Sequence, residues 1–284
     1  MRHSSISLPS SQRQPFNRFR QGAQQTPAEF ADLVEEIPLA ISVNGIAHAV
    51  MMVTPVNLDA FTIGFARTEG IIEHINDVRD ISTQHAHTYP NITSIAINLE
   101  ISPRRFAQFK HKKQTHLGAT GCGLCGVESL SEAIPELSPL PTSHPLKEKD
   151  LASLRKTLSE YQVLGKQTGA VHAALLISPT GEAICCMEDI GRHNALDKII
   201  GYALQQDINL HNHSVLMSSR CSTELVQKAV RVGLSRLIHL ASPSTLAVKL
   251  AQHYGLTLIH LPKQDEPRVF SSSTYKKDAF NGAT

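Results

Sequence analysis

Short apolar segments alternate with amphipathic ones throughout the second half of the chain, and no other feature constrains the fold as strongly. Apolar runs at 170–177 and 183–187 flank Ser178-Pro179-Thr180-Gly181, which predicts a β-hairpin. The segments that follow predict helices at 194–206, 223–232 and 245–254, and strands at 214–217, 237–241 and 256–261. A hairpin followed by this alternation predicts an α/β fold, in which helices cover a mixed sheet.

The first half of the chain predicts a smaller β/α subdomain. Apolar segments at 37–43 and 46–53 flank Asn44-Gly45, which is a strong signal for a tight hairpin. The apolar spacing that begins at Leu58 predicts a helix ending near Gly70. Large apolar residues at every second position of 95–101 predict a further, half-buried strand: Ile95, Ile97, Leu99 and Ile101.

Composition divides the chain into five parts. Residues 1–28 are polar and lack an apolar core segment, so we expect a disordered tail rather than a secretory signal. The N-terminal subdomain is expected at 29–134, a proline-rich linker at 135–146 and the second domain at 147–270. Residues 271–284 are expected to form a second tail.

Charge and composition exclude several classes of protein. The chain has 27 Lys and Arg against 25 Asp and Glu, so its net charge of +2 does not drive binding to nucleic acid or acidic membranes. Tryptophan is absent, which argues against aromatic platforms that stack on single-stranded nucleic acid. No apolar run approaches the roughly 18 residues of a membrane helix. Five cysteines make a poor disulfide framework and suit a reducing compartment. We therefore expect a soluble cytoplasmic protein that binds neither nucleic acid nor membranes.

Two of the cysteines, Cys122 and Cys125, lie in the segment Gly-Cys-Gly-Leu-Cys-Gly at 121–126. The glycines leave both thiols uncovered, and a short helix expected at 127–134 would favour the thiolate of Cys125. A structural zinc site would need two more ligands, and a second Cys-x-x-Cys is missing. A thioredoxin-like dithiol and inert structural thiols are further interpretations. A reactive loop that carries a persulfide agrees best with the glycines.

Polar segments also follow three successive strands of the second domain. Gly191, Arg192 and His193 lie in the first of them, Ser219 and Arg220 in the second, and the third is Ser242-Pro243-Ser244-Thr245. Ligands of open α/β sheets bind where strands end and helices begin, so the three segments predict a shared phosphate or nucleotide pocket. Ordinary helix capping with solvated charges, including those of Asp197 and Lys198, is the alternative.

Several other residues have a structural and a functional interpretation. His172 is either a satisfied core histidine or a ligand, whereas Cys185 and Cys186 are most simply small core residues. Cys221 lies at a junction between loop and helix, and the sequence does not decide between a structural and a functional role for it. The basic stretch at 104–113 is either a solvated face or an anion-attracting surface beside the cysteines.

In combination these motifs resemble the FdhD family, the accessory sulfurtransferases of formate dehydrogenase. The resemblance extends over roughly residues 35–270. The motifs that carry it are Gly121–Gly126, Thr168–Ala174, Glu188–Lys198 and Ser219–Lys228, with Gly64–Gly70 and Ser242–Ala247 in support. It implies a cytidine-deaminase-like second domain, a homodimer, and a sulfurtransferase that acts through a cysteine persulfide. It also implies sulfur transfer from a cysteine desulfurase to the bis-molybdopterin guanine dinucleotide form of the molybdenum cofactor, before that cofactor enters formate dehydrogenase.

The resemblance assigns roles to particular residues. Cys122 matches the cysteine that carries the persulfide, and Cys125 is its neighbour in the motif. The segment that matches the cofactor-binding loop is Leu261, Pro262, Lys263, Gln264, Asp265 and Glu266. Relatives have Gly-Arg where this chain has Asp265-Glu266, and two carboxylates would repel a pyrophosphate.

Three other functions remain as alternatives. The chain could be a non-catalytic chaperone that holds the cofactor, or a zinc-binding protein that uses the Cys-x-x-Cys pair. A zinc deaminase would need His-x-Glu or Cys-x-Glu upstream of Pro-Cys-x-x-Cys. This chain has neither triplet in the segment upstream of its thiol pair, and no proline precedes that pair.

Overall fold

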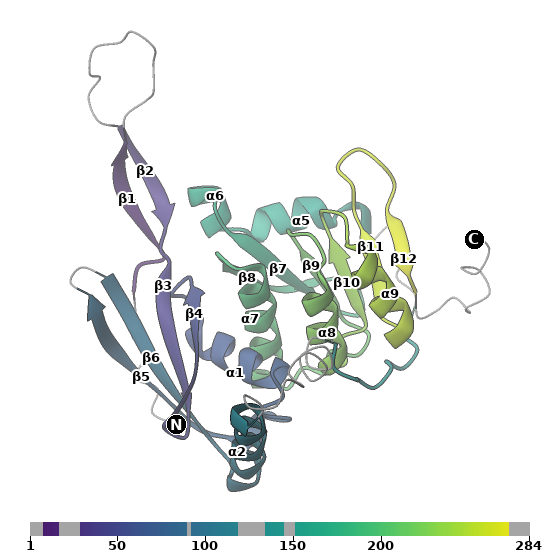
Figure 1. The fold of residues 1–284 in the computed structure, drawn as a ribbon. Helices are drawn as coiled ribbons and strands as arrows, with labels where there is room; N and C mark the ends of the chain where they lie inside the picture. Colours follow the sequence, from purple (N-terminus) through teal and green to yellow (C-terminus); the bar gives the residue numbers. More distant parts are fainter. Residues whose placement is uncertain (1–7, 17–28, 90–91, 119–133, 145–150, 273–284) are drawn as a thin grey trace.

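The computed structural model describes residues 8–16, 29–89, 92–118, 134–144 and 151–272. Two sheets stand on either side of a central pair of helices, α1 (Leu58–Thr68) and α7 (Arg192–Gln205) (Figure 1). Helix α1 packs on the sheet of the first half of the chain, and α7 packs on the sheet of the second half. The chain is therefore layered as sheet, helix, helix and sheet.

The first sheet has four strands in the order β4-β3-β6-β5. Strands β3 (Ile37–Val43) and β4 (Ile46–Val53) form the hairpin that Asn44-Gly45 predicts, and β6 (Ile92–Ile101) lies parallel to β3. The fourth strand, β5 (Val78–Tyr89), was not predicted, because it is rich in polar residues and lies at the sheet edge. Helix α1 ends as the sequence predicts, and the 3-10 turn η1 (Ile75–Asp77) leads into β5.

The basic stretch forms helix α2 (Pro103–Gly118). The interpretation of its charges as a solvated face is wrong for Arg105, which is 6% exposed. Its guanidinium donates to the carbonyls of Gly70 and Ile71 and forms an ion pair with Glu73 at 2.6 Å. Arg105 thus fastens α2 to the turn after α1.

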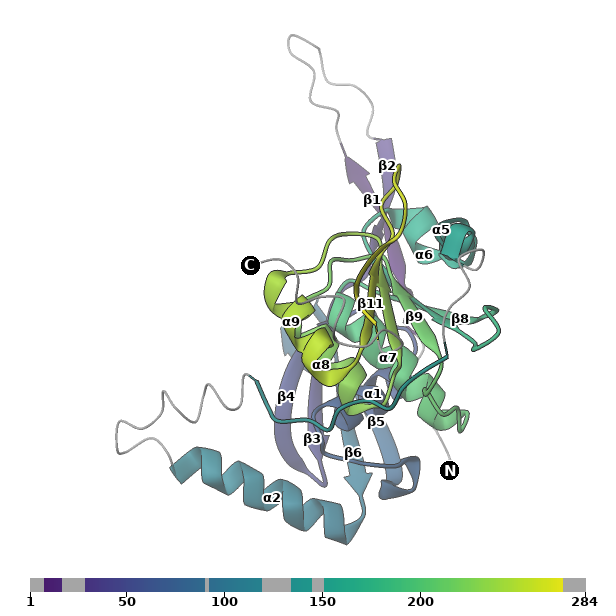
Figure 2. The same ribbon diagram turned by 90° about the vertical axis from the view of Figure 1, so that its right-hand side faces the viewer.

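The second sheet has six strands in the order β12-β11-β10-β9-β7-β8. The predicted hairpin is β7 (His172–Ile177) with β8 (Ala183–Asp189), and β9 (Ser214–Met217), β10 (Arg236–His239) and β11 (Thr257–His260) run parallel to one another. Helices α7, α8 (Thr223–Arg231) and α9 (Thr245–Tyr254) cover one face, and α5 (Leu154–Tyr161) covers the other (Figure 2). The short helix α6 (Leu164–Thr168) follows α5, and β12 (Arg268–Ser271) closes the far edge. The predicted mixed α/β architecture is confirmed, while the specific likeness to cytidine deaminases stays a prediction.

Two segments differ from what composition predicts. Residues 11–16, expected within a polar tail, form β1 (Ser11–Phe16), which pairs with β2 (Glu29–Val34) as an arm beyond the body (Figure 1). Backbone pairing across the arm supplies the order that the polar composition of this segment does not indicate. The proline-rich segment 134–144 lacks helix and strand, yet it packs along the second domain. There the backbone N–H of Leu140 donates to the carbonyl of Tyr254, and the hydroxyl of Tyr254 donates to the carbonyl of Pro135.

Candidate functional site

The carboxyl ends of β8, β9, β10 and β11 lie along one edge of the six-stranded sheet, here called the carboxyl edge. Helices α7, α8 and α9 begin there, because each follows one of these strands directly. The predicted segments around Gly191, Ser219 and Ser244 and the segment 261–266 therefore all lie at this edge. The three polar segments thus share one edge of the sheet, and the phosphate or nucleotide pocket expected from them stays a prediction.

Hydrogen bonds join these segments to one another. The Nε2 atom of His193 lies 3.3 Å from the hydroxyl of Ser222, at the start of α8. The backbone N–H of Ser244 donates to the carbonyl of Cys221 at 3.1 Å, and that of Leu261 donates to the carbonyl of His239 at 2.8 Å. The loops of the carboxyl edge thus form one connected surface.

Much of the segment Glu188–Lys198 has a structural role. Asp189 and Lys198 form an ion pair of 2.7 Å, and both side chains are 0% exposed. Asp189 also accepts from the backbone N–H of Thr54 at 3.1 Å and from the side chain of Asn194 at 2.8 Å. Burial lowers the pKa of Lys198, and the charge of Asp189 opposes that shift. This pair ties the end of β4 to α7 and thereby joins the two halves of the chain.

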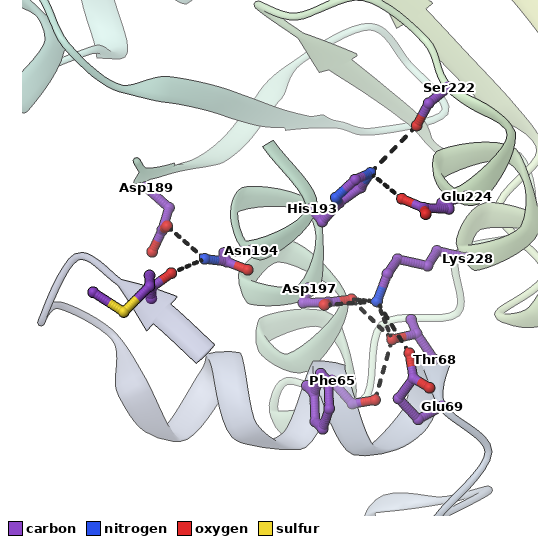
Figure 3. Close-up of polar contacts among 11 residues, drawn as sticks. Phe65, Thr68, Glu69, Asp189, His193, Asn194, Asp197, Ser222, Glu224 and Lys228 are labelled. Carbon is purple, nitrogen blue, oxygen red and sulfur yellow. Dashed lines mark hydrogen bonds and ion pairs between the residues drawn. The ribbon is translucent and has the colours of Figure 1, made fainter. Parts of the chain in front are cut away.

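A second ion pair, between the buried Asp197 and the partly buried Lys228, joins α1, α7 and α8 (Figure 3). Asp197 lies 2.8 Å from Nζ of Lys228, and the hydroxyl of Thr68 donates to Asp197 at 2.9 Å. The alternative interpretation, in which Asp197 and Lys198 are solvated charges, is wrong: Asp197 is 1% exposed and Lys198 is 0% exposed. Asp197 contacts Thr68 of α1 and Lys228 of α8, whereas Lys198 contacts the carbonyl of Thr54 at the end of β4. The local pattern of α7 does not reveal these distant partners. Burial raises the pKa of Asp197, and Lys228 opposes the shift.

Glu188 also acts structurally. Its carboxylate accepts from the backbone N–H groups of Val163, Leu164 and Gly165 at 2.7 to 2.9 Å. These three donors lie at the start of α6, where N–H groups lack partners within the helix. Glu188 therefore caps α6 and holds it against β8.

Arg192 and His193 remain as candidates for chemistry. His193 lies 2.8 Å from the carboxylate of Glu224, and its side chain is 26% exposed (Figure 3). Burial lowers the pKa of His193, and Glu224 opposes that shift. The Nε atom of Arg192 is buried and has no hydrogen-bond partner among the described residues. The start of α7 thus carries a guanidinium cation and an imidazole, side chains that can bind an anion and transfer a proton.

His172 begins β7 at the same edge. Burial lowers its pKa, and the charge of Arg192 adds to that effect. The residue is half-buried. Its two interpretations, as a core residue and as a ligand, both remain.

Ser219 and Arg220 follow β9. Ser219 is buried and its hydroxyl donates to the carbonyl of Arg220 at 3.0 Å, whereas Arg220 is exposed. Gly191 is the N-cap of α7, and a Cβ there would lie 2.7 Å from Nδ2 of Asn194. The residue at position 191 thus needs the space of a glycine, while Arg220 is free to meet solvent.

The segment 261–266 leaves the carboxyl edge after β11. Leu261 is buried and its carbonyl accepts from Arg155 at 2.5 Å, whereas the segment is exposed from Lys263 onward. Asp265 forms an ion pair with Arg268 at 2.5 Å, and the hydrogen bond from Arg268 lowers the pKa of Asp265. The charge of Asp265 is therefore partly neutralised within the chain.

Cys122 and Cys125 lie outside the described residues, so their roles stay predictions. Burial raises the pKa of the thiols of Cys185, Cys186 and Cys221 to about 12 in each case. These three cysteines are neutral thiols at pH 7 and poor nucleophiles. Residues 8–272, apart from the gaps given above, hold no group of three His, Cys, Asp or Glu arranged for a metal ion.

Sequence reasoning missed His239 and His260. They end β10 and β11 and are 0% and 7% exposed. The available signal was a polar ring at the last position of two otherwise apolar strands. In the part of the chain that the structure describes, no helix is long and apolar enough to cross a membrane.

Comparison with known proteins places this arrangement in a family. The model of the FdhD/NarQ family matches residues 34–275. Proteins named "Sulfur carrier protein FdhD" from Bordetella bronchiseptica and Bordetella parapertussis are each 36% identical over 254 residues, which is 89% of this chain and 90% of theirs. The crystal structure of a protein assigned as a formate dehydrogenase accessory protein from Desulfotalea psychrophila superposes with a TM-score of 0.71 at 26% identity, over 93% of this chain and 98% of that one. The chain belongs to the FdhD/NarQ family.

Proposed function

We propose that this protein is a sulfurtransferase that takes persulfide sulfur from a cysteine desulfurase. It passes the sulfur to the bis-molybdopterin guanine dinucleotide form of the molybdenum cofactor before that cofactor enters formate dehydrogenase. The observation that carries the proposal is the similarity, over 89% of the chain, to relatives named as sulfur carrier proteins. The Cys-x-x-Cys segment supplies the sulfur chemistry that such a role needs.

Cys122 accepts the sulfur by exchange between thiolate and persulfide. Its thiolate attacks the terminal sulfur of the donor persulfide, a new S–S bond forms on Cys122, and the donor cysteine leaves as a thiolate. This step needs no external oxidant or reductant. The surrounding glycines give the backbone the freedom to approach both donor and acceptor.

Cys125 resolves the persulfide. Its thiolate attacks the Sγ atom of Cys122, a disulfide forms between the two cysteines, and the terminal sulfur leaves as hydrosulfide toward the molybdenum centre of the substrate. The two thiols supply the two electrons that reduce the sulfane sulfur. A cellular dithiol then reduces the disulfide and restores the pair.

The carboxyl edge docks the anionic guanine dinucleotides of the cofactor. Arg192, Arg220 and Lys263 supply positive charge, with backbone N–H groups at the starts of α7, α8 and α9. His193, paired with Glu224, accepts a proton at this edge. The segment 261–266 contributes through its backbone and Lys263, since Asp265 is engaged with Arg268. The proposal includes a homodimer with cytidine-deaminase-like second domains in the cytoplasm.

Intact-mass measurement tests the proposal directly. The full chain is incubated with a cysteine desulfurase and free cysteine, and we expect the gain of one sulfur atom that a dithiol reductant removes. Cys122→Ala abolishes this gain, whereas the control Cys185→Ser retains it because Cys185 is a half-buried, neutral thiol. Cys125→Ala still gains the sulfur and releases it more slowly.

Two other outcomes would separate the alternatives. Binding of guanine nucleotide without any gain of sulfur would favour a chaperone that only holds the cofactor. Tightly bound zinc lost in both Cys122→Ala and Cys125→Ala, again without gain of sulfur, would favour a zinc-binding protein.

A further inference from the structure

Met217, His239 and His260 occupy equivalent positions on three neighbouring parallel strands. His239 pairs with His260 across β10 and β11, and with Met217 across β10 and β9. Adjacent strands lie about 4.8 Å apart, so paired residues have neighbouring side chains on one face. That face is the one covered by α7–α9, because Met217 itself and Leu237, two residues before His239, belong to that core. One thioether and two imidazoles thus form a row beneath these helices.

Each imidazole keeps one buried ring nitrogen that has no hydrogen-bond partner among the described residues. The Nδ1 atom of His239 donates to the carbonyl of Ser219 at 3.1 Å, and its Nε2 atom has no partner within the described part of the chain. The ring of His260 is hydrogen-bonded to the backbone of Leu240, and its Nδ1 atom is likewise buried without a described partner. A buried polar atom without a partner costs free energy, and native structures contain few of them.

A neutral ring nitrogen with a free lone pair is able to act as a ligand to a metal ion. Burial lowers the pKa of His239 to about 4 and also lowers that of His260, so both rings are neutral at pH 7. In a neutral ring whose one N–H is engaged, the other nitrogen carries a free lone pair. Histidines that bind metals commonly donate their second ring N–H to a backbone carbonyl, as His239 does to Ser219.

We propose that Met217, His239 and His260 form a binding site for a soft monovalent metal ion of the Cu(I) class. All three ligands are neutral, and a divalent ion would bring two uncompensated charges into a buried site. Thioether sulfur favours Cu(I), and imidazole binds copper as well. The described residues add no third His, Cys, Asp or Glu at this place, which suits an ion that accepts few ligands.

Neighbouring charges also favour a monovalent ion over a divalent one. The cations whose charge reaches His260 are Arg155 and Arg268, and Arg268 is paired with Asp265. Repulsion from these guanidinium groups doubles for a divalent ion, so they disfavour Zn(II) more than Cu(I). His260 directly precedes the segment 261–266, so the ion would bind beside the proposed cofactor loop. The site does not depend on the sulfur transfer proposed above.

The experiment uses the full chain with Cys122→Ser and Cys125→Ser, so that the Cys-x-x-Cys pair does not compete for copper. Cu(I), kept reduced by ascorbate, is titrated against a chromophoric Cu(I) chelator, and we expect one ion per chain. His239→Leu and His260→Leu each weaken binding at least tenfold, and Met217→Leu weakens it less. His253→Leu, on the exposed face of α9, is the matched control and leaves binding unchanged. X-ray absorption of the loaded protein shows two nitrogen ligands and one sulfur ligand.

Three outcomes would overturn the proposal. These are the absence of Cu(I) binding, binding that both histidine variants retain, and absorption spectra with sulfur ligands alone. Binding of Zn(II) as tightly as Cu(I) would overturn the assignment to a monovalent ion. If His239→Leu does not fold, as judged by circular dichroism, His260→Leu decides the test, because His260 lies nearer the surface.

Discussion

Gly64 of α1 and Gly201 of α7 lie against each other with no room for a side chain on either. A Cβ built on Gly64 would lie 2.9 Å from the backbone nitrogen of Gly201 and 1.8 Å from the carbonyl oxygen of Asp197. A Cβ on Gly201 would meet the carbonyl oxygen of Ala60 at 1.8 Å. This backbone contact brings α1 close enough to α7 for Thr68 to reach Asp197, so it positions the ion pair beneath the carboxyl edge.

Gly64→Ala should destabilise the protein by at least about 3 kcal/mol or prevent folding, because backbone atoms cannot yield as side chains do. Urea unfolding followed by circular dichroism measures the change. Gly169→Ala serves as the control: a Cβ there meets nothing within 4 Å, and only its positive φ of 68° is strained. The control should cost about 1 kcal/mol. Equal losses in the two variants would contradict the close approach.

Lys198→Met should cost about 3–5 kcal/mol, because it leaves the buried carboxylate of Asp189 without its cation. The double variant Asp189→Asn/Lys198→Met should be more stable than Lys198→Met alone, since it removes the uncompensated charge. Chemical unfolding of the two variants at pH 7 provides the comparison. A double variant less stable than the single one would show that the hydrogen bonds of Asp189 matter more than its charge.

The free energy of unfolding should decrease on acidification, because His239 binds a proton more readily in the unfolded chain than in the folded protein. In the unfolded chain this histidine takes up a proton near its ordinary pKa of 6.5, whereas burial lowers its pKa in the folded protein to about 4. The unfolded state therefore binds more protons between these two pKa values. The stabilising contribution that neutral His239 makes at pH 7 is lost as the pH falls through this range. The expected loss is about 3 kcal/mol. Unfolding of metal-free protein at several pH values should show a shallower dependence in His239→Asn, and equal slopes would contradict the assignment.

Cys185, Cys186 and Cys221 should resist alkylation in the native protein, because burial raises the pKa of each thiol to about 12. Iodoacetamide at pH 7.5 followed by peptide mapping should find these three unmodified until denaturant is added. The denatured protein is the control, since all its thiols should react. Rapid modification of Cys221 in the folded state would show that its burial is not maintained in solution.

Asp265→Asn should strengthen the binding of guanosine diphosphate several-fold under the proposed function. The substitution removes one negative charge and releases the guanidinium of Arg268 for the phosphates. Calorimetric titration at low and moderate salt measures the effect, which should shrink as salt rises. Glu182→Gln, in the distant turn between β7 and β8, removes the same charge far from the carboxyl edge and should leave affinity unchanged. Weaker binding by Asp265→Asn would show that the ion pair itself shapes the loop.

Local sequence patterns were sufficient to predict most helices and strands of the second domain. Helices α8 and α9 and strands β9 to β11 lie within a residue or two of the predicted ranges, because apolar periodicity and turn residues are contained in short windows of sequence. Helix α7 begins at Arg192, two residues before the predicted start. Strand β5 escaped prediction because a polar edge strand depends on pairing with β6, which its own residues do not indicate.

The sequence by itself determined the order of the elements, the reactive character expected of the Cys-x-x-Cys segment and the family resemblance, since each depends on residues close together in the chain. Only the tertiary structure decided that Asp189, Asp197 and Lys198 are buried partners of distant segments. It alone showed that Gly64 meets Gly201, and that Met217, His239 and His260 share one row. Burial and pairing depend on contacts between residues far apart in sequence, and the periodicity of a single helix or strand carries no information about its distant partners.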